Sequence, residues 1–229
     1  TVTLLRDTTE SVSVLWQVYN GLNYNYDLTI DLNGKTVTGK GGSVFTFKRT
    51  QSYSDSMMNV TFNDSVGTGV VTGGNATNGG AINFDSQYGC AKLVINGGKF
   101  TGNTASEAGG AICAKFAKGT KNAAQKTIEV VLNGGEITAN NAKEGGGLYV
   151  WNNISILNQG GCKVYANTAS SQGDDIAYRA TTSPSDAKMS LAENAWFIDK
   201  KGTRYDAANP VPFTKWANYT EKGSAAAVY

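Results

Sequence analysis

Apolar and polar residues alternate with a period of two in five segments that share a glycine-rich sequence. In each segment every second residue is apolar, and the residues between them are mostly polar. The apolar positions are Leu28, Ile30 and Leu32; Met58, Val60 and Phe62; Ala91, Leu93 and Ile95; Ile128, Val130 and Leu132; and Ile154 and Ile156. Because successive side chains of a strand point to opposite faces, this pattern predicts five equivalent β-strands, each with one buried face.

Two further sets of apolar positions recur after these strands. One set follows the glycine turn, at Val37, Phe100, Ile137 and Val164, and the other follows a double glycine, at Ile82, Ile112, Leu148 and Ile176. Three strands per coil, each stacked on its equivalent in the next coil, predict an all-β fold, a right-handed parallel β-helix or solenoid. We expect the β-helix over residues 28–190, an N-terminal cap with the first strands over 1–27, and a C-terminal cap and tail over 191–229.

Glycine and asparagine mark the predicted corners between strands. Asn-Gly-Gly follows the first strand at residues 96–98 and 133–135, and glycine reaches positive φ without steric cost. A later corner carries Asn75, Asn103, Asn140 and Asn167. Asparagine tolerates the left-handed region, and amides stacked in a column hydrogen-bond into a ladder. We expect these residues to be structural, because a corner recurs in every coil and an active site does not.

Composition narrows the classes of function. The 229 residues include 28 Gly, 3 Pro and no His, and 20 basic against 18 acidic residues leave a net charge of +2. Without histidine, Ser-His and Cys-His nucleophiles, His-ligated zinc and imidazole acid–base catalysis are excluded. Neither sign of charge forms a run, so we expect no nucleic-acid partner. We also expect no metal and no cofactor. We expect no membrane insertion, because no apolar stretch approaches the length of a membrane helix.

The cysteines bear on disulfide bonding, and the first residues bear on whether the chain is part of a longer protein. Cys90, Cys113 and Cys162 are an odd number without Cys-x-x-Cys spacing, which predicts at most one bridge within the chain. Cys113 takes an outward position, where it either reaches Cys90 or stays a free thiol. The sequence opens at Thr1 without a signal peptide, and we expect a fragment of a longer protein.

Asp174 and Asp175 are the candidate catalytic residues. They align with the glycine corners of earlier coils, which favours a structural role at a corner. The alternatives are a cation site, or a lateral groove in which the pair acts as a lyase or hydrolase on a polyanionic polysaccharide. Such hydrolysis requires a carboxylic acid with a raised pKa and a separate carboxylate that activates water.

Outward apolar and aromatic residues are the candidate binding residues. Val94, Val131 and Leu157 form an outward column, which is either covered by an insertion loop or a recognition patch. Aromatic planes beside amides suit sugar rings or a protein hot spot, and capping or loop packing is the alternative. These aromatic residues are Tyr149, Trp151, Trp16, Tyr24 and Tyr26. Lys99, Glu136 and Lys163 form a further outward column of alternating charge.

Several motifs occur together along the chain. They are Asp31-Leu-Asn-Gly34, Asn96-Gly-Gly-Lys-Phe-Thr-Gly-Asn-Thr-Ala105, Gly145-Gly-Gly-Leu-Tyr149, Gly173-Asp-Asp-Ile176 and the late Trp196-Phe-Ile-Asp199. This combination resembles the right-handed β-helix repeat regions of bacterial cell-surface proteins of the adhesin type from gut anaerobes. It has a looser likeness to polymorphic outer-membrane autotransporter passengers.

The resemblance implies a secreted or wall-attached parent protein at the bacterial surface. We therefore expect a non-enzymatic adhesion segment that presents loops and outward ladders to a host glycan or a host protein. A carbohydrate-active enzyme that uses the aspartate pair and a purely structural stalk are the alternatives.

Overall fold

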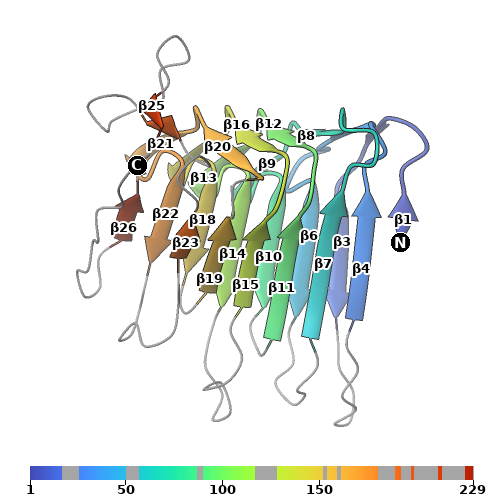
Figure 1. Cartoon of the computed structure of the whole chain (residues 1–229), viewed down its shortest axis with the longest axis horizontal. Helices are drawn as coiled ribbons and strands as arrows, with labels where there is room; N and C mark the ends of the chain where they lie inside the picture. The colour runs from blue at the N-terminus through green and yellow to red at the C-terminus, as the bar shows by residue number, and fades with distance from the viewer. Residues whose placement is uncertain are drawn as a thin grey trace.

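The computed structural model describes residues 1–16, 26–49, 57–86, 90–116, 128–151, 154–158, 161–179, 189–191, 197–198, 211–212 and 225–228. Strands and turns make up these residues, and no helix occurs among them. Figure 1 shows the strands stacked side by side along the long axis, from β1 near the N-terminus to β22 and β26 near the C-terminus. The predicted all-β parallel solenoid is confirmed.

Sheet A contains the five strands that the alternating pattern predicts. Its order is β1-β4-β7-β11-β15-β19-β23, with β1 (Val2–Thr3), β4 (Tyr26–Asp31), β7 (Met57–Asn63), β11 (Cys90–Ile95), β15 (Ile128–Leu132), β19 (Ile154–Asn158) and β23 (Met189–Leu191). The central apolar residues stack in register, at Leu28, Val60, Leu93, Val130 and Ile156. Equivalent residues therefore form one column, as the repeat requires.

Sheets B and C contain the two other predicted sets. Sheet B contains β2 (Thr8–Thr9), β5 (Thr36–Thr38), β8 (Val70–Thr72), β12 (Lys99–Thr101), β16 (Glu136–Thr138) and β20 (Lys163–Tyr165). Sheet C contains β3 (Val12–Trp16), β6 (Phe45–Arg49), β10 (Ile82–Ser86), β14 (Ile112–Phe116), β18 (Leu148–Trp151) and β22 (Ile176–Arg179), followed by β26 (Ala225–Val228). The pairing of β26 with β22 is antiparallel, whereas the other pairs in this sheet are parallel.

A fourth sheet adds a strand to the three expected in each coil between β7 and β22. Sheet D contains β9 (Asn75–Asn78), β13 (Thr104–Ala108), β17 (Asn141–Glu144) and β21 (Thr168–Gln172). Its strands shift register before Ala108, so the period of two is interrupted there. Its inward residues, such as Ala105 and Ala142, are small, which gives a weak hydrophobic signal in the sequence. A separate antiparallel pair joins β24 (Phe197–Ile198) and β25 (Val211–Pro212).

One apolar core runs inside the column. Its members come from the inward faces of sheets A, B and C, and Leu93, Ile112 and Ile137 among them are fully buried. Aromatic rings link neighbouring coils, since Phe62 contacts Phe100 edge-on with ring centroids 5.8 Å apart. Each fully buried side chain of this size stabilises the fold by roughly 1.5–3 kcal/mol, so the core holds the outer faces in a rigid geometry.

Candidate functional site

The outer face of sheet A presents three parallel rows of side chains, which we call the sheet A face. The first row is Asp27, Asn59, Lys92 and Glu129, the central row is Thr29, Thr61, Val94 and Val131, and the third row is Asp31, Asn63, Asn96 and Asn133. Residues within a row lie on adjacent strands, about 4.8 Å apart. The sheet A face is therefore a regular surface with polar borders, and its centre is apolar at Val94 and Val131.

The third row is a ladder of amides at the surface. Asn96 Nδ2 donates to Asn63 Oδ1 at 2.8 Å, and Asn133 Nδ2 donates to Asn96 Oδ1 at 2.9 Å. Asn96 and Asn133 are exposed. An amide has two N–H donors and two acceptor lone pairs, so the ladder leaves Asn96 with one donor and one lone pair for a ligand. The repeated Asn before a double glycine is the sequence signal for this row, although the sequence pattern by itself indicates only a corner.

The first and central rows differ in character. Lys92 Nζ pairs with Glu129 Oε2 at 3.4 Å, and Asn59 Nδ2 donates to Asp27 Oδ1 at 2.6 Å. Between the two polar rows, Val94 and Val131 point outward and are half-buried. The backbone of Leu157 continues the central row beside Val131. The predicted outward column is thus a stripe with ordered polar groups on both sides.

Tyr149 and Trp151 lie on a different sheet, on the outer side of β18. Tyr149 is only 4% exposed and packs in a small apolar cluster with Ala108, Cys113 and Ala177. Trp151 is half-buried and packs against this cluster. The Tyr149 ring consequently offers no open plane to a ligand.

Two of the three N-terminal aromatic candidates stand at the ends of strands. Trp16 ends β3 opposite the buried Arg49, and Tyr26 begins β4 opposite the buried Met58, so both backbones continue rows of inward residues. Tyr24 lies outside the described residues. The sequence-predicted candidates therefore separate into the sheet A face, the cluster on sheet C and the first coils.

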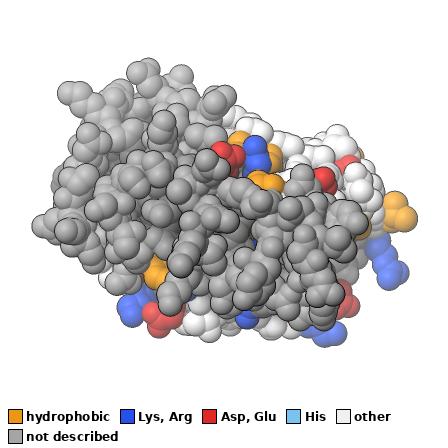
Figure 2. All heavy atoms as spheres, turned by 90° about the horizontal axis from the view of Figure 1, so that it is seen from below, with side chains coloured by type: hydrophobic (Ala, Val, Ile, Leu, Met, Phe, Trp, Pro, Cys, Tyr) orange, Lys and Arg blue, Asp and Glu red, His pale blue; other side chains and the backbone are white. Residues whose placement is uncertain are grey.

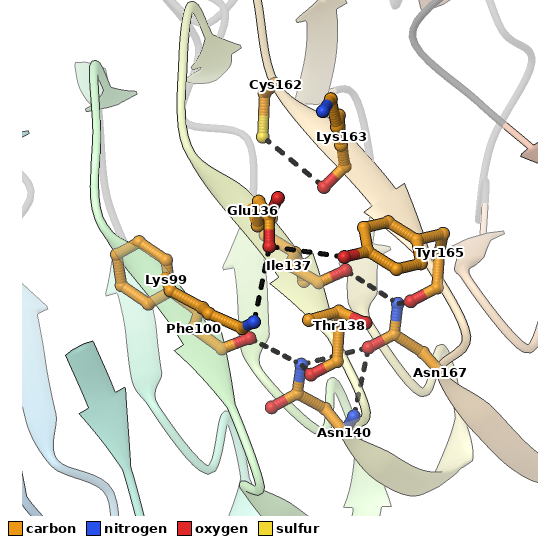
Figure 3. Close-up of polar contacts among 10 residues, drawn as sticks. All are labelled: Lys99, Phe100, Glu136, Ile137, Thr138, Asn140, Cys162, Lys163, Tyr165 and Asn167. Atoms are coloured by element: carbon orange, nitrogen blue, oxygen red, sulfur yellow. Dashed lines mark hydrogen bonds and ion pairs between the residues drawn. The ribbon is translucent and has the colours of Figure 1, made fainter. Parts of the chain in front are cut away.

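A buried asparagine ladder runs along the corner between sheets B and D (Figure 3). Asn140 Oδ1 accepts hydrogen bonds from the backbone N and the Nδ2 of Asn103, both at 3.0 Å. Asn167 Oδ1 accepts the equivalent pair from Asn140, at 3.1 and 2.9 Å. The predicted ladder is confirmed for these three asparagines, each at most 3% exposed.

Two details of this corner differ from the expectation. Asn75 does not belong to the ladder. Asn75 pairs in register with Thr104, so Gly74 rather than Asn75 lies opposite Asn103. The Gly74 N–H donates to Asn103 Oδ1 at 3.0 Å. The left-handed residue is not the asparagine but the one before it, as at Ala139 and Ala166, both with φ of 54°. The amide side chain therefore serves the corner by hydrogen bonding rather than by its backbone conformation.

The aspartate pair ends this corner at its C-terminal side. Asp175 Oδ1 accepts from the backbone N of Asn167 at 3.2 Å and from its Nδ2 at 2.8 Å, as the next amide of the ladder would. Asp174 Oδ1 accepts from the N–H of Ala169 in β21 at 2.7 Å. Asp175 is 5% exposed. These contacts support the corner interpretation, because a general acid must reach its substrate.

Asp175 predicts a pH dependence of stability. Burial raises the pKa of Asp175 to about 6, and the neighbouring Asp174 adds to the shift, while the hydrogen bonds from Asn167 oppose it. The folded state binds this proton more tightly than the unfolded state, whose carboxyl has an ordinary pKa near 3.8. The protonated Asp175 therefore stabilises the folded state fully below about pH 4, and this stabilisation is lost as the pH rises through about 6. The contribution to the free energy of unfolding changes by about 3 kcal/mol over this range.

We expect Asp175→Asn to be more stable than the wild type at neutral pH and to lose this pH dependence. Urea unfolding followed by circular dichroism at several pH values measures the effect. Asp27→Asn, at an exposed position, controls for the removal of one negative charge. Parallel pH profiles for the wild type and Asp175→Asn would contradict the assignment.

The outer row of sheet B carries the predicted alternating charges. Lys99, Glu136 and Lys163 lie in register, and Lys99 Nζ pairs with Glu136 Oε2 at 3.4 Å. The hydroxyl of Tyr165 donates to the same oxygen at 3.2 Å (Figure 3). Figure 2 shows a different face, seen from below, on which the visible acidic and basic side chains also lie close to one another. This mixed surface does not favour a polyanionic ligand.

The described residues also limit other kinds of chemistry. Cys113 and Cys162 are buried, and burial raises the pKa of each thiol to about 12, so neither is an activated nucleophile. Within the described ranges no cluster of three or more His, Cys, Asp or Glu side chains is arranged to hold a metal ion. No helix in the described part of the chain has the length and apolarity to cross a membrane.

Comparison with protein-family models, curated proteins and solved structures finds no match to this chain. The functional argument therefore rests on the residues and their arrangement.

Proposed function

We propose that this chain is a non-enzymatic adhesion segment of a bacterial surface protein and that its sheet A face binds a host glycan. The observation that carries the proposal is the set of three parallel rows, in which Val94 and Val131 stand between a ladder of amides and a polar row that contains the Lys92–Glu129 ion pair. The resemblance of the repeats to adhesin-type β-helices supports the extracellular setting and the parent protein at the cell surface.

The chemistry of the three rows suits an extended sugar polymer. Sugar rings have apolar faces of C–H groups, which pack on side chains such as Val94 and Val131. Their hydroxyl groups donate and accept hydrogen bonds, and the amides of Asn96 and Asn133 offer both functions. Because the rows repeat at the strand spacing, a chain lying along the column makes many modest contacts rather than filling one deep pocket.

Rigidity favours this mode of binding. The side chains of the sheet A face stand on strands whose opposite sides are held in the core by Val60, Leu93 and Val130, all fully buried. A surface that is already ordered loses little conformational entropy when a ligand binds, so modest contacts add up to useful affinity.

A glycan array probed with the 229-residue chain tests the proposal. We expect binding to extended glycans, and we expect the double variant Val94→Thr, Val131→Thr to weaken it by about tenfold, because two methyl groups of about 0.8 kcal/mol each are lost from the contact. Threonine keeps the shape and the β-propensity of valine, so the variant retains the sheet.

Val70→Thr is the matched control, because Val70 is a half-buried outward valine on sheet B, in the row of Lys99. It should bind as the wild type does. Binding to host proteins but to no glycan, or equal affinity of the double variant and the wild type, would contradict the proposal.

A further inference from the structure

The Lys115 side chain makes a contact that belongs neither to the sheet A face nor to the charged row of sheet B. Lys115 Nζ donates to Asn78 Oδ1 at 2.7 Å, although the two residues are 37 positions apart in the sequence. Lys115 lies on β14 and Asn78 ends β9, so the contact joins two successive coils at the outer corner between sheets C and D. Given a C=O bond of about 1.2 Å, Nζ lies roughly 3–4 Å from Cγ of Asn78, close to the distance of an attacking nucleophile.

A carboxyl group lies next to Lys115 on the neighbouring strand. Asp85 of β10 is directly opposite Lys115 in register and on the same outer side of sheet C. Burial raises the pKa of Asp85, an effect that the charges of Lys48 and Lys115 oppose. A carboxyl group with a raised pKa takes up and returns protons more readily near neutral pH than an ordinary aspartate.

A buried apolar cluster borders this contact. Lys115 Nζ lies 5.9 Å from the centroid of the Tyr149 ring. Tyr149 belongs to the buried cluster with Ala108 and Cys113, and Cys113 lies two residues before Lys115 on the same side of β14. Asn78 pairs in register with Ala108 of the same cluster. The lysine and the amide thus meet at the edge of a buried apolar cluster.

We propose that Lys115 and Asn78 form an intramolecular amide bond, with Asp85 as the group that transfers the protons. Asp85 takes a proton from Nζ of Lys115, and the Nζ lone pair forms a bond to Cγ of Asn78. As the Cγ–Nδ2 bond breaks, Asp85 passes this proton to Nδ2 and takes a second proton from Nζ, and ammonia leaves. An amine and a primary amide become a secondary amide and ammonia, so no oxidant, reductant or cofactor takes part.

The bond would make this pair a modification site. It is independent of the proposed glycan binding, because the pair lies at the corner between sheets C and D rather than on the sheet A face. It would link β9 covalently to β14 and close the segment between them. A cross-link between coils resists separation of the stack under load, which suits a solenoid that stands at a surface.

The intact mass of the denatured chain tests the bond directly. We expect the folded and then denatured protein to be lighter than its sequence by one ammonia, about 17 Da. We also expect a tryptic peptide in which Lys115 is joined to Asn78 and is not cleaved. A wild-type mass equal to that of the sequence, after prolonged incubation of the folded protein, would overturn the proposal.

Variants separate this reaction from other losses of ammonia. Lys115→Arg keeps the charge and the donor but has no nucleophilic amine, so its mass should equal that of its sequence. Asp85→Asn should slow the loss by about a hundredfold or more, and Asp85→Glu should retain it. Lys143→Arg, at an exposed lysine paired with Glu107, is the matched control and should lose ammonia as the wild type does. A loss that persists in Lys115→Arg would place the reaction at another asparagine and overturn the proposal.

Discussion

Gly110→Ala is expected to unfold the solenoid or to lower its free energy of unfolding by at least about 4 kcal/mol. A Cβ atom on Gly110 would lie 2.6 Å from the carbonyl oxygen of Asn141 and closer still to that of Gly146, both in the next coil. Backbone atoms cannot move aside as a flexible side chain does. The coils would have to separate, which breaks hydrogen bonds such as that from Gly110 N to Gly145 O at 3.0 Å. Thermal and urea unfolding followed by circular dichroism measure the loss.

Gly67→Ala is the matched control for this substitution. Gly67 has a positive φ of 87°, but a Cβ at this position would meet nothing within 4 Å. It should cost only the strain of a left-handed alanine, about 1–2 kcal/mol. An equal loss in both variants would show that the close approach of coils is not what Gly110 provides.

Asn140→Ala is expected to lower the free energy of unfolding by about 3–5 kcal/mol. Its Nδ2 donates to the carbonyl oxygens of Phe100 and Thr138 at 2.9 and 3.0 Å, in addition to the bonds with the two neighbouring asparagines. The site is 1% exposed, so water does not replace these partners freely. Alanine would leave several buried polar groups unpaired at once, and urea unfolding measures the cost.

Asn133→Ala tests whether burial, rather than the ladder arrangement alone, gives the effect. Asn133 also belongs to a row of hydrogen-bonded amides, but it is exposed on the sheet A face. Its partners can bond to water, so the change should stay within about 0.5 kcal/mol. Similar losses for Asn133→Ala and Asn140→Ala would contradict the assigned role of the buried ladder.

The strands of sheets A, B and C were predictable because their signal is local. Within a segment such as 91–95 or 128–132, every second side chain is apolar, and this alternation alone identifies the buried face. Sheet D gave no such signal. Ala105 and Ala142 bury little apolar area, and the register shift before Ala108 interrupts the period.

The candidate sites were less predictable, because they depend on which residues of neighbouring coils become partners. The column of Val94 and Val131 was found from aligned repeats, and the register confirms it. Tyr149 has an aromatic side chain suited to binding, yet the structure buries it. Asn75 resembles the ladder residues in sequence, but a shift of one position puts Gly74 in its place.

The alternation of apolar and polar residues and the glycine corners were enough to predict a stacked β-solenoid, and the absence of histidine excluded histidine-dependent catalysis. Each of these features is a property of single residues or short segments. The tertiary arrangement alone decided that Asp175 ends the asparagine ladder and that Lys115 meets Asn78. The physical reason is that these contacts join groups from different strands or coils. The connections between the strands differ in length, so spacing in the sequence alone does not say which residues become neighbours.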